Sequence, residues 1–336
     1  MPQSGSVSVG RRSFLAGLGA AAIGSARCGR LGGGPVVLRV SHSMTAGPTS
    51  LHIFAEAFAR RVEEAANGAV KVRLFTSNTL GQEREVVQQL QEGLVDFMVS
   101  GSAIWGSVAP RLQLLDFPFV WRDWDHVHRV VDGPLGREVA DYLAGSVRMR
   151  PLAFFDSFGF RHVVTRSRDI LTPADLANLK IRTIQASIYV KTIELMGGSP
   201  TPMAFGEVYT SLQTGVIDGF EHDASTTLQQ RFYEVAKVMT RTRHIAGVLG
   251  LWASTITLER LPADLRSLIE RAATEAALEQ RGLGPAEEAA ALTTLKAQGM
   301  TVREFDNSVF RERAERLWAS EARALDVAPW LRTILS

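Results

Sequence analysis

The sequence predicts an α/β protein made of two lobes that share one plan. Segments with strand-like alternation are followed by segments with helical spacing along most of the chain, which is the pattern of α/β folds. A length of 336 residues suggests about two domains. The third observation is a sequence pattern that occurs twice.

The repeated pattern covers residues 85–96 and again 207–218. Each copy reads Glu-Val, three variable residues, Leu-Gln, one variable residue, Gly, two apolar residues and Asp. This order predicts a short helix, a glycine just past its end and then a buried strand. Two copies are too few for a solenoid, which needs at least ~3 units, but they suit two similar lobes. A chance match of a common helix–glycine–strand sequence is the alternative.

Composition excludes several classes of protein. The chain is 46% hydrophobic and 21% charged, which is typical of a globular protein. A net charge of +2, with no basic stripe that interleaves aromatic residues, argues against nucleic-acid binding. Cys28 is the single cysteine, so an internal disulfide framework is excluded. No run of about 18 apolar residues is present, so nothing is expected to span a membrane permanently.

Residues 1–26 are predicted to be an export signal. Arg-Arg-Ser-Phe-Leu at 11–15 precedes a short apolar run at 16–23 and small residues at 24–26. Paired arginines followed by Phe-Leu resemble the twin-arginine type of signal. A disordered basic tail is the alternative interpretation.

The export signal predicts a periplasmic protein. We expect cleavage near Ala26, and residues 27–35 then form a glycine-rich linker. Cys28 could be a lipidation site, but Arg27 stands where such sites prefer a small residue. The mature protein is therefore expected to be soluble.

The first half of the chain alternates strands and helices. Apolar residues at helical spacing follow Ser50, which is the expected N-cap, while 70–74 alternates apolar and basic residues as a half-exposed strand does. Residues 94–99 are almost continuously apolar, as in a buried parallel strand. In order, the predicted elements are strand 36–40, helix 51–65, strand 70–74, helix 85–91, strand 94–99, a helix around 127–131 and strand 152–155.

The second half repeats this alternation and ends in helices. Gly159 is a possible hinge at the crossover between the lobes, and Pro200 and Pro202 predict a rigid turn. The predicted elements are a short helix after Thr172, strand 179–182, helix 207–213, a strand from 216, a return strand at 245–257, helices over 262–295 interrupted at Gly282 and Gly284-Pro285, strand 302–305 and a helical region at 310–335.

Two loops are expected to face each other. In open α/β sheets, ligands bind outside the carboxyl ends of the strands. Residues 100–105 and 220–223 hold this position in the two copies of the repeat. If the lobes face each other, these loops lie across a cleft.

No catalytic motif is found. The sequence has no metalloprotease helix, no Gly-x-Ser-x-Gly elbow and no phosphate-binding loop. His126 and His128 are two positions apart, which puts them on different faces of a helix. We therefore expect no catalytic residues, no metal and no cofactor.

Cations and aromatic residues at strand ends are the candidate binding residues. Arg182 closes a strand and Arg161 lies beside the possible hinge, and a guanidinium matches a carboxylate with two parallel hydrogen bonds. Each arginine could instead be a solvated surface charge. Phe205 and Trp105 could form walls around a carbon skeleton, or they could be core residues.

Two further polar residues lie at the same strand ends. His222 ends the strand of the second repeat copy and could donate a hydrogen bond to a carboxylate or carbonyl oxygen. A structural hydrogen bond is as plausible. Gln185, just past Arg182, is a weaker candidate for the same role.

Several blocks resemble a known family. Residues 201–219, Thr-Pro-Met-Ala-Phe-Gly-Glu-Val-Tyr and then Leu-Gln-Thr-Gly-Val-Ile-Asp-Gly, resemble the signature of the extracytoplasmic solute-binding subunit of tripartite ATP-independent periplasmic (TRAP) transporters, the dicarboxylate-binding, DctP-like type. Residues 79–81, 90–96, 179–182 and 231–235 also resemble its blocks. The resemblance covers roughly residues 36–301.

The resemblance implies a fold and a site. The fold would be two α/β lobes, each a mixed sheet flanked by helices, that close on a ligand and are joined by a long bridging helix. The family's selectivity arginine falls on Arg182, a second arginine on Arg161 and the pocket aromatic on Phe205. Glu83 completes the candidate ligand-binding set. His222 stands where the family usually has Asn, so a simple transfer of C4-dicarboxylate or sialic-acid specificity is in doubt.

The predicted lobes are residues 36–158 with about 248–285, and 159–247 with about 286–336. The predicted function is capture of a small organic acid by hinge closure and its delivery to TRAP membrane subunits. Two alternatives remain at this point: a ligand sensor for a signalling partner, and an exported enzyme.

Overall fold

The computed structural model describes residues 34–336. The predicted export signal, its cleavage near Ala26 and Cys28 lie outside the described residues. No helix within residues 34–336 combines the length and the apolar character needed to cross a bilayer. Nor do three or more metal-ligating side chains gather anywhere in that range. Residues 35–336 form one compact unit.

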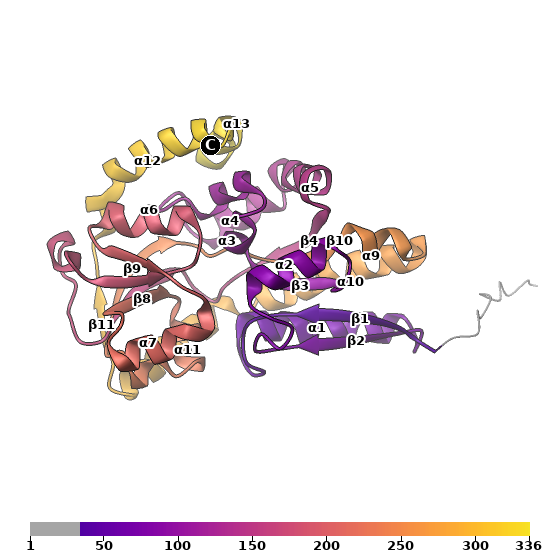
Figure 1. Cartoon of the computed structure of the whole chain (residues 1–336), viewed down its shortest axis with the longest axis horizontal. Helices are drawn as coiled ribbons and strands as arrows, with labels where there is room; N and C mark the ends of the chain where they lie inside the picture. Colours follow the sequence, from indigo (N-terminus) through magenta and orange to yellow (C-terminus); the bar gives the residue numbers. More distant parts are fainter. Residues whose placement is uncertain (1–33) are drawn as a thin grey trace, which may run out of the picture. The chain divides into compact units, whose positions relative to one another are not determined.

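The first sheet has five strands in the order β2-β1-β3-β10-β4. Parallel pairing joins β1 to both β2 and β3, whereas β10 runs antiparallel between β3 and β4. Figure 1 shows β10 beside β3 and β4, although it comes about a hundred residues later in the chain. The strands are β1 (Val36–Ser41), β2 (Val70–Phe75), β3 (Phe97–Gly101), β4 (Met149–Phe155) and β10 (Leu249–Ser254).

The second sheet has six strands in the order β11-β9-β5-β8-β6-β7. Here β6 pairs in parallel with β7 and β8, and β5 runs antiparallel between β8 and β9. An edge strand, β11, pairs in parallel with β9. The strands are β5 (Arg161–Thr165), β6 (Lys180–Thr183), β7 (Ser199–Pro202), β8 (Gly219–His222), β9 (Val238–Ile245) and β11 (Thr301–Glu304).

The two sheets follow one plan. Five neighbouring strands of the second sheet, β7-β6-β8-β5-β9, match β2-β1-β3-β10-β4 of the first in order and in direction. The repeated sequence forms α2 (Glu83–Gln91) before β3 and α7 (Val208–Thr214) before β8. The predicted α/β fold with two similar halves is confirmed.

The aspartate that ends each copy of the repeat makes the same hydrogen bond in both halves. Asp96 accepts a hydrogen bond from the backbone N–H of Arg39 at 2.7 Å, and Asp218 accepts one from the backbone N–H of Lys180 at 2.8 Å. Each carboxylate thus ties the start of one strand to the neighbouring parallel strand. The glycines of the repeat, Gly93 and Gly215, have φ of 73° and 77°, a conformation in which a side chain is strained.

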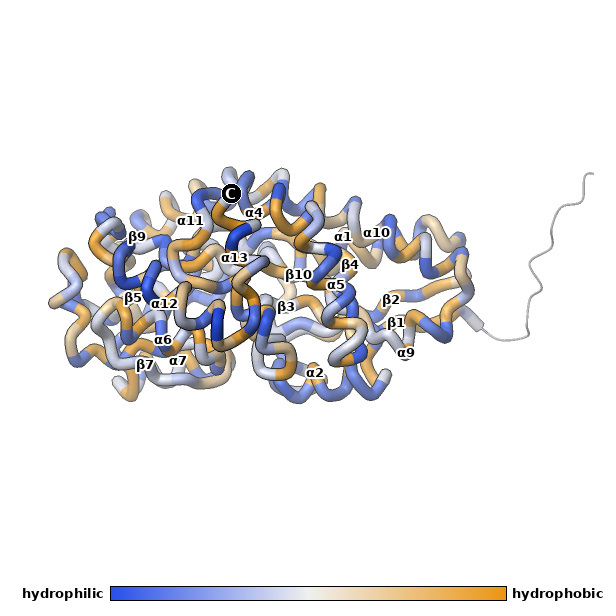
Figure 2. The backbone as a smooth tube through the Cα atoms, turned by 90° about the horizontal axis from the view of Figure 1, so that it is seen from above, coloured by the Kyte–Doolittle hydropathy of each residue, from blue (hydrophilic) through white to orange (hydrophobic). Residues whose placement is uncertain are grey.

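Two consecutive helices, α10 (Ala263–Arg281) and α11 (Gly284–Ala297), join the two halves. The first packs against α1 (Ser50–Ala65) and β4, whereas the second packs against α8 (Ala224–Gln229) and β11. Hydrophobic and hydrophilic residues alternate along α10, as expected for a helix with one buried face (Figure 2). The single bridging helix is therefore two helices, separated where Gly282 and Gly284-Pro285 indicated an interruption.

The C-terminal helices pack on segments from the first half of the chain. The indole N–H of Trp318 in α12 (Arg311–Ala324) donates to the carbonyl of Pro118, and that of Trp330 in α13 (Ala328–Leu335) donates to Glu138. His126 in α4 (Trp124–Val131) contacts the carbonyl of Ile334 at 2.7 Å. The predicted lobe boundaries, which put residues 286–336 with the second lobe, stay a prediction.

Each half buries its own aromatic residues. In the first, the rings of Phe54 and Phe155 stack at 4.1 Å between α1 and the sheet. In the second, Phe220 packs against Phe232 at 4.7 Å. The remaining helices are α3 (Ser102–Trp105), α5 (Pro134–Val147), α6 (Ser187–Met196) and α9 (Thr255–Arg260), with short 3₁₀ turns at Pro110–Asp116, Pro173–Leu176, Phe205–Glu207, Phe232–Glu234 and Asn307–Phe310.

Three predicted strands differ in their bounds. β3 begins at Phe97 instead of 94 and β8 at Gly219 instead of 216, because Leu94 and Val216 point outward with about half of their surface exposed. The predicted return strand at 245–257 is instead the end of β9, a turn and then β10, so the chain crosses from one sheet to the other at 246–248. Residues 245–253 are mostly apolar, so nothing in the sequence indicated that one strand ends and another begins there.

Two turn signals were also interpreted wrongly. The N-cap of α1 is Thr49, whose hydroxyl accepts from the backbone N–H of His52, and not Ser50. Pro200 and Pro202 lie in β7, where we expected a rigid turn. β7 is an edge strand, so a residue that lacks the N–H group is tolerated there.

We predict that Gly219→Ala destabilises the protein by ~1–3 kcal/mol, because β8 lies inside the second sheet. A Cβ at residue 219 would come within 2.5 Å of the carbonyl oxygen of Val164 and 3.1 Å of Ile181. Urea unfolding measures the change in the free energy of unfolding. The control is Gly145→Ala in α5, which has open space around it and should stabilise the helix by roughly 0.5–1 kcal/mol. Equal effects of both variants would contradict the proposed packing.

Candidate functional site

The candidate site is a cavity lined by residues from both halves of the fold. Its empty volume is ≈ 560 Å³. The loop after β1, α2 and α3 contribute Ser43, Glu83 and Ile104, and the second sheet contributes Arg161, Arg182 and His222. Backbone from the crossing at 247–249 closes one side. Loops that follow equivalent strands of the two sheets therefore meet at one cavity.

Arg182 is a buried cation without a carboxylate partner. Its side chain comes from β6 and the residue is 3% exposed. Nε and Nη2 both donate to the carbonyl of Met203, at 3.1 and 2.8 Å, and the guanidinium lies 5.8 Å from the ring centre of Phe205. Within residues 34–336, neither a salt bridge nor a hydrogen bond from Nη1 is found. Burial lowers the pKa of Arg182 to about 10, which shows a charge that its surroundings do not fully compensate.

Arg161 lies in the same cavity but is already paired. From the start of β5, its Nε and Nη2 donate to both carboxylate oxygens of Glu221, and Nη2 also donates to the Glu221 carbonyl at 2.8 Å. Burial alone would lower the pKa of Arg161, but Glu221 outweighs burial and raises it. In the same way burial opposes ionisation of Glu221, yet Arg161 and His244 bring its pKa down to about 2. Arg161 and Glu221 thus form a buried ion pair at the cavity.

Asp116 is a buried acid that connects the two halves. Ser102 in α3 donates to one of its oxygens at 2.7 Å and the phenol of Tyr189 in α6 donates to the other at 3.1 Å. Burial raises the pKa of Asp116 to about 7, because the hydrogen bonds only partly compensate the lost hydration. Asp116 therefore brings an acid that titrates near neutral pH to the cavity wall.

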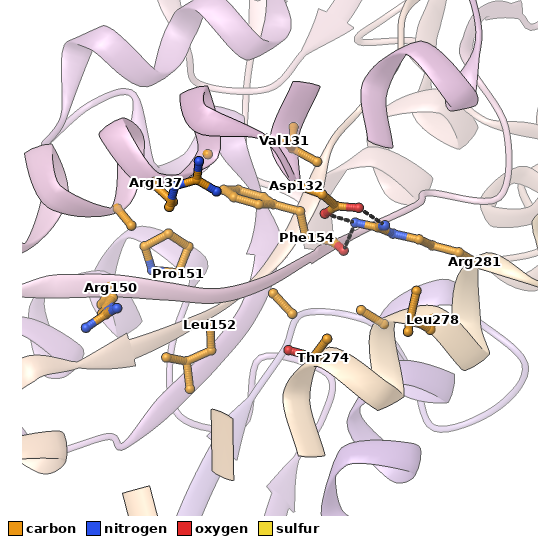
Figure 3. Close-up of a pocket in the computed structure, with 15 residues that line it drawn as sticks. Val131, Asp132, Arg137, Arg150, Pro151, Leu152, Phe154, Thr274, Leu278 and Arg281 are labelled. Atoms are coloured by element: carbon orange, nitrogen blue, oxygen red, sulfur yellow. Dashed lines mark hydrogen bonds and ion pairs between the residues drawn. The ribbon is translucent and has the colours of Figure 1, made fainter. Parts of the chain in front are cut away.

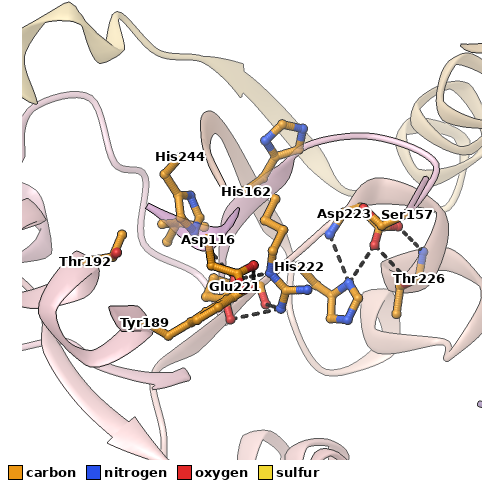
Figure 4. A network of polar contacts seen from close by, with 12 residues as sticks. Asp116, Ser157, His162, Tyr189, Thr192, Glu221, His222, Asp223, Thr226 and His244 are labelled. Carbon is orange, nitrogen blue, oxygen red and sulfur yellow. Dashed lines mark hydrogen bonds and ion pairs between the residues drawn. The ribbon is translucent and has the colours of Figure 1, made fainter. Parts of the chain in front are cut away.

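His222 and Asp223 form a polar pair at the end of β8. The Nδ1 atom of His222 lies 2.7 Å from the Asp223 carboxylate and 3.0 Å from the Asp223 backbone N. Asp223 also caps α8, since its carboxylate accepts from both the backbone N–H and the hydroxyl of Thr226. Burial lowers the pKa of His222, so its ring is neutral. Figure 4 shows the ring held by Asp223 on one side only.

The other sequence-predicted residues are distributed around this cavity. Phe205 lines it, and its half-buried ring meets that of His222 edge to face at 5.7 Å. Glu83 lines it from α2 and accepts from the Ser43 hydroxyl at 3.1 Å, and burial raises the pKa of Glu83. Gln185 is exposed and lines a smaller neighbouring pocket, shared with Arg182, Glu83 and Phe205.

Trp105 does not reach the cavity, and the prediction that it walls a ligand is wrong. It is fully buried, packs against Trp252 at 5.0 Å and donates its indole N–H to Ser100. The neighbouring residue, Ile104, lines the cavity instead. Both residues belong to α3, and consecutive side chains of a helix point in different directions. Ile104 therefore faces the cavity, and Trp105 faces the core.

The sequence reasoning missed Asp116, Tyr189, Glu221 and Asp223. Asp116 had a usable signal, because it is a single acid within the apolar run 114–121. Glu221 lies in a strand where every residue is buried, and a buried acid requires a partner. Tyr189 had no signal, since its helical position alone does not place it at a ligand site.

A second groove between α5, β4 and α10 is less suited to an anion (Figure 3). Its partly buried guanidinium, Arg281, donates to both oxygens of Asp132 at 2.6 and 2.9 Å and to the carbonyl of Phe154. That cation is therefore neutralised within the protein, and the other two arginines of the groove, Arg137 and Arg150, are exposed to solvent. The cavity at Arg182 offers a cation that is not.

Comparison with known proteins identifies the family. Residues 40–324 match the model of bacterial extracellular solute-binding protein, family 7 (DctP). The chain belongs to this family. The resemblance seen in the sequence blocks is confirmed, and the family is made of binding proteins.

Relatives and solved structures agree with this membership. The solute-binding protein is 31% identical to the 2,3-diketo-L-gulonate-binding periplasmic protein YiaO of Escherichia coli, over 77% of this chain and 78% of the relative. It is 31% identical to the C4-dicarboxylate-binding periplasmic protein DctP of Rhodobacter capsulatus, over 83% of both chains. A TRAP periplasmic solute-binding protein of Polaromonas bound to D-erythronate is 29% identical, with a TM-score of 0.85 over 90% of this chain and 98% of that one.

For this solute-binding protein we predict that Glu221→Gln lowers the free energy of unfolding by ~3–5 kcal/mol, because it leaves the Arg161 charge buried without a counter-ion. The loss should depend on pH. The folded-state pKa of Glu221, about 2, is below its ordinary value of 4.5, so the carboxylate stabilises the fold above pH 4.5 and this contribution fades as the pH falls towards 2.

Urea unfolding of both proteins between pH 7 and 3 measures this effect. The difference between wild type and Glu221→Gln should be constant at the upper end and shrink below pH 4.5. A difference that stays constant down to pH 3 would contradict the assigned ion pair.

Proposed function

We propose that this protein captures a small carboxylic acid in the cavity at Arg182 and delivers it to the membrane subunits of a TRAP transporter. The observation that carries the proposal is the buried guanidinium of Arg182, for which the described residues provide a carbonyl oxygen but no carboxylate. A buried charge is stable only when it is paired, so the missing partner is an anion that arrives with the ligand.

The chemistry of the relatives supports a carboxylate ligand. 2,3-Diketo-L-gulonate, C4-dicarboxylates and D-erythronate, which the three relatives bind, share a carboxylate group. A guanidinium recognises that group through two parallel hydrogen bonds, and Nη1 of Arg182 is available for one of them. Nη1 of Arg161 can donate to the same carboxylate, while Glu221 neutralises the charge of Arg161 and accepts from its other nitrogen atoms. Phe205 covers the carbon skeleton.

Closure of the two halves is the proposed mechanism of capture. Within residues 34–336, three connections carry the chain between strands of the two sheets: 156–160, 246–248 and the stretch from β10 to β11, in which α10 and α11 are separated at 282–284. Gly159, in the first of them, has a φ of 126°, which suits a hinge. The ligand touches both halves, so it favours the closed state by the difference in its affinity for the two states.

The remaining parts of the proposal concern partners and location. The relatives named above are periplasmic, and we propose that this protein reaches the periplasm through a twin-arginine signal at residues 11–15. Ligand transfer to the membrane subunits uses an ion gradient there, and this chain carries out no catalysis.

We predict that Arg182→Ala lowers carboxylate affinity at least ~10-fold, which corresponds to about 1.4 kcal/mol. The loss of a charge-assisted hydrogen bond in a dry cavity is expected to be at least that large. Calorimetric titration of a carboxylate ligand into both proteins measures it. The control is Arg332→Ala on the exposed face of α13, which removes the same charge far from the cavity. Unchanged affinity in Arg182→Ala would refute the assignment.

We further predict that organic acids raise the melting temperature of the wild-type protein through mass action, because they bind only the folded state. A ligand at 100 times its Kd adds about 2.7 kcal/mol of stability. A thermal-shift screen of mono- and dicarboxylates, sugar acids and their neutral alcohols tests this. Hits confined to neutral compounds would contradict the carboxylate class.

A further inference from the structure

The inference concerns the second ring nitrogen of His222 and rests on the proposed function. The residue is 93% buried and its side chain lines the cavity beside Phe205. Nδ1 makes every hydrogen bond of the ring that is found within residues 34–336, and Nε2 makes none. Figure 4 shows this free nitrogen on the side of the ring away from Asp223. Nε2 is not among the fully enclosed polar atoms, so it faces the open space of the cavity, where a ligand can reach it.

Asp223 determines what kind of partner fits. A carboxylate oxygen at 2.7 Å from Nδ1 requires a proton on Nδ1, because two lone pairs would otherwise repel each other. The backbone N–H of Asp223 favours the opposite tautomer, in which Nδ1 accepts. A hydrogen bond to a charged group is stronger than one between neutral groups, so the carboxylate prevails. Nε2 then carries a lone pair.

The ring stays neutral, so Nε2 accepts and does not donate. Burial is the main reason, and the nearby Arg161 adds to it. An acceptor binds a hydroxyl group of a ligand. It repels a carboxylate oxygen, which brings only lone pairs.

The other charges of the cavity point in the same direction. Arg182 is its unpaired cation among the described residues, since Glu221 neutralises Arg161. The remaining ionisable groups on the wall are the acids Glu83, Asp116 and Asp223. One carboxylate of a ligand therefore finds a partner, and a second carboxylate faces acceptors.

We propose that His222, oriented by Asp223, selects a hydroxylated monocarboxylic acid by accepting a hydrogen bond from one of its hydroxyl groups. Arg182 holds the carboxylate at the other end of the molecule. This histidine thereby becomes a specificity determinant, which discriminates against an unsubstituted dicarboxylate.

The first experiment compares matched acids by calorimetric titration. D-Erythronate is compared with succinate, and D-gluconate with adipate, so that chain length is the same within each pair. In the pair whose length fits the cavity, the hydroxy acid should bind at least ~10-fold more tightly than the dicarboxylate of the same chain length. The hydroxy acid that binds better is then replaced by its monodeoxy analogues, one of which should lose that advantage.

Two variants assign the effect to His222. His222→Phe keeps a ring against Phe205 but removes the acceptor, so the advantage of the hydroxy acid over that deoxy analogue should disappear. Asp223→Asn keeps an equally good N-cap for α8 and lets an amide donate to Nδ1, which moves the ring proton to Nε2. The ratio of hydroxy-acid to dicarboxylate affinity should then fall at least ~10-fold.

A readout that needs no ligand tests the tautomer itself. In protein labelled with ¹⁵N-histidine, the resonances of His222, assigned by their loss in His222→Phe, should show a protonated Nδ1 and an unprotonated Nε2 at pH 7. In Asp223→Asn the two should be exchanged. A wild-type ring protonated on Nε2 would overturn the inference.

The possible binding results separate this inference from the proposed function. Preference for succinate or adipate, or an unchanged ratio in Asp223→Asn, would overturn the role of His222 and leave carboxylate capture intact. No binding of any of the four acids, together with no effect of Arg182→Ala on any other carboxylate, would overturn both.

Discussion

The structure of the site depends on a positive charge that the protein buries and leaves unpaired. Arg182 donates from two of its nitrogen atoms to one backbone carbonyl, and no carboxylate of residues 34–336 lies within salt-bridge distance of it, although the charges of Glu221 and Glu83 act on it from further away. Removing a guanidinium from water is unfavourable, and a carbonyl compensates only part of the loss. The cavity therefore favours an anionic ligand. In the proposed function the carboxylate of the ligand compensates this charge, which would couple capture to the stability of the closed state.

The doubled plan of the sheets explains how that charge meets the rest of the site. Register places Ser41 of β1 and Arg182 of β6 at equivalent points, two residues beyond the strand position that each repeat aspartate ties down. Only the second of these positions lines the cavity, so the shared plan carries a cation there and a buried serine at its counterpart. Differences at equivalent positions of the two sheets therefore make the cavity asymmetric.

The two arginines of the cavity show how neighbours divide similar residues into different roles. Arg161 donates to both carboxylate oxygens of Glu221, which neutralises its charge. It still lines the cavity, so it can donate a further hydrogen bond to a ligand. His222 and Asp223 show the same principle on a smaller scale, since a carboxylate next to a ring decides which nitrogen faces the ligand. In both cases a buried acid determines the chemistry of the group that the ligand meets.

The sequence by itself determined the two-lobed α/β fold, the equivalence of residues 85–96 and 207–218, the break near Gly282 and the placement of Arg182 at a strand end. These depend on local periodicity, on glycine and on spacing, which a single chain displays directly. It also pointed to Phe205, Glu83 and His222 as residues near a ligand.

Only the tertiary structure decided which of these residues face the cavity and in what state. The core takes Trp105, because side-chain direction in α3 depends on the packing around Trp252. Arg161 pairs with Glu221, sixty residues away, and Asp116 accepts a hydrogen bond from Tyr189. Both contacts arise from the packing of strands and helices, which sequence spacing does not encode. Charge, tautomer and burial are properties of neighbours in space, so they appear only once the chain has folded.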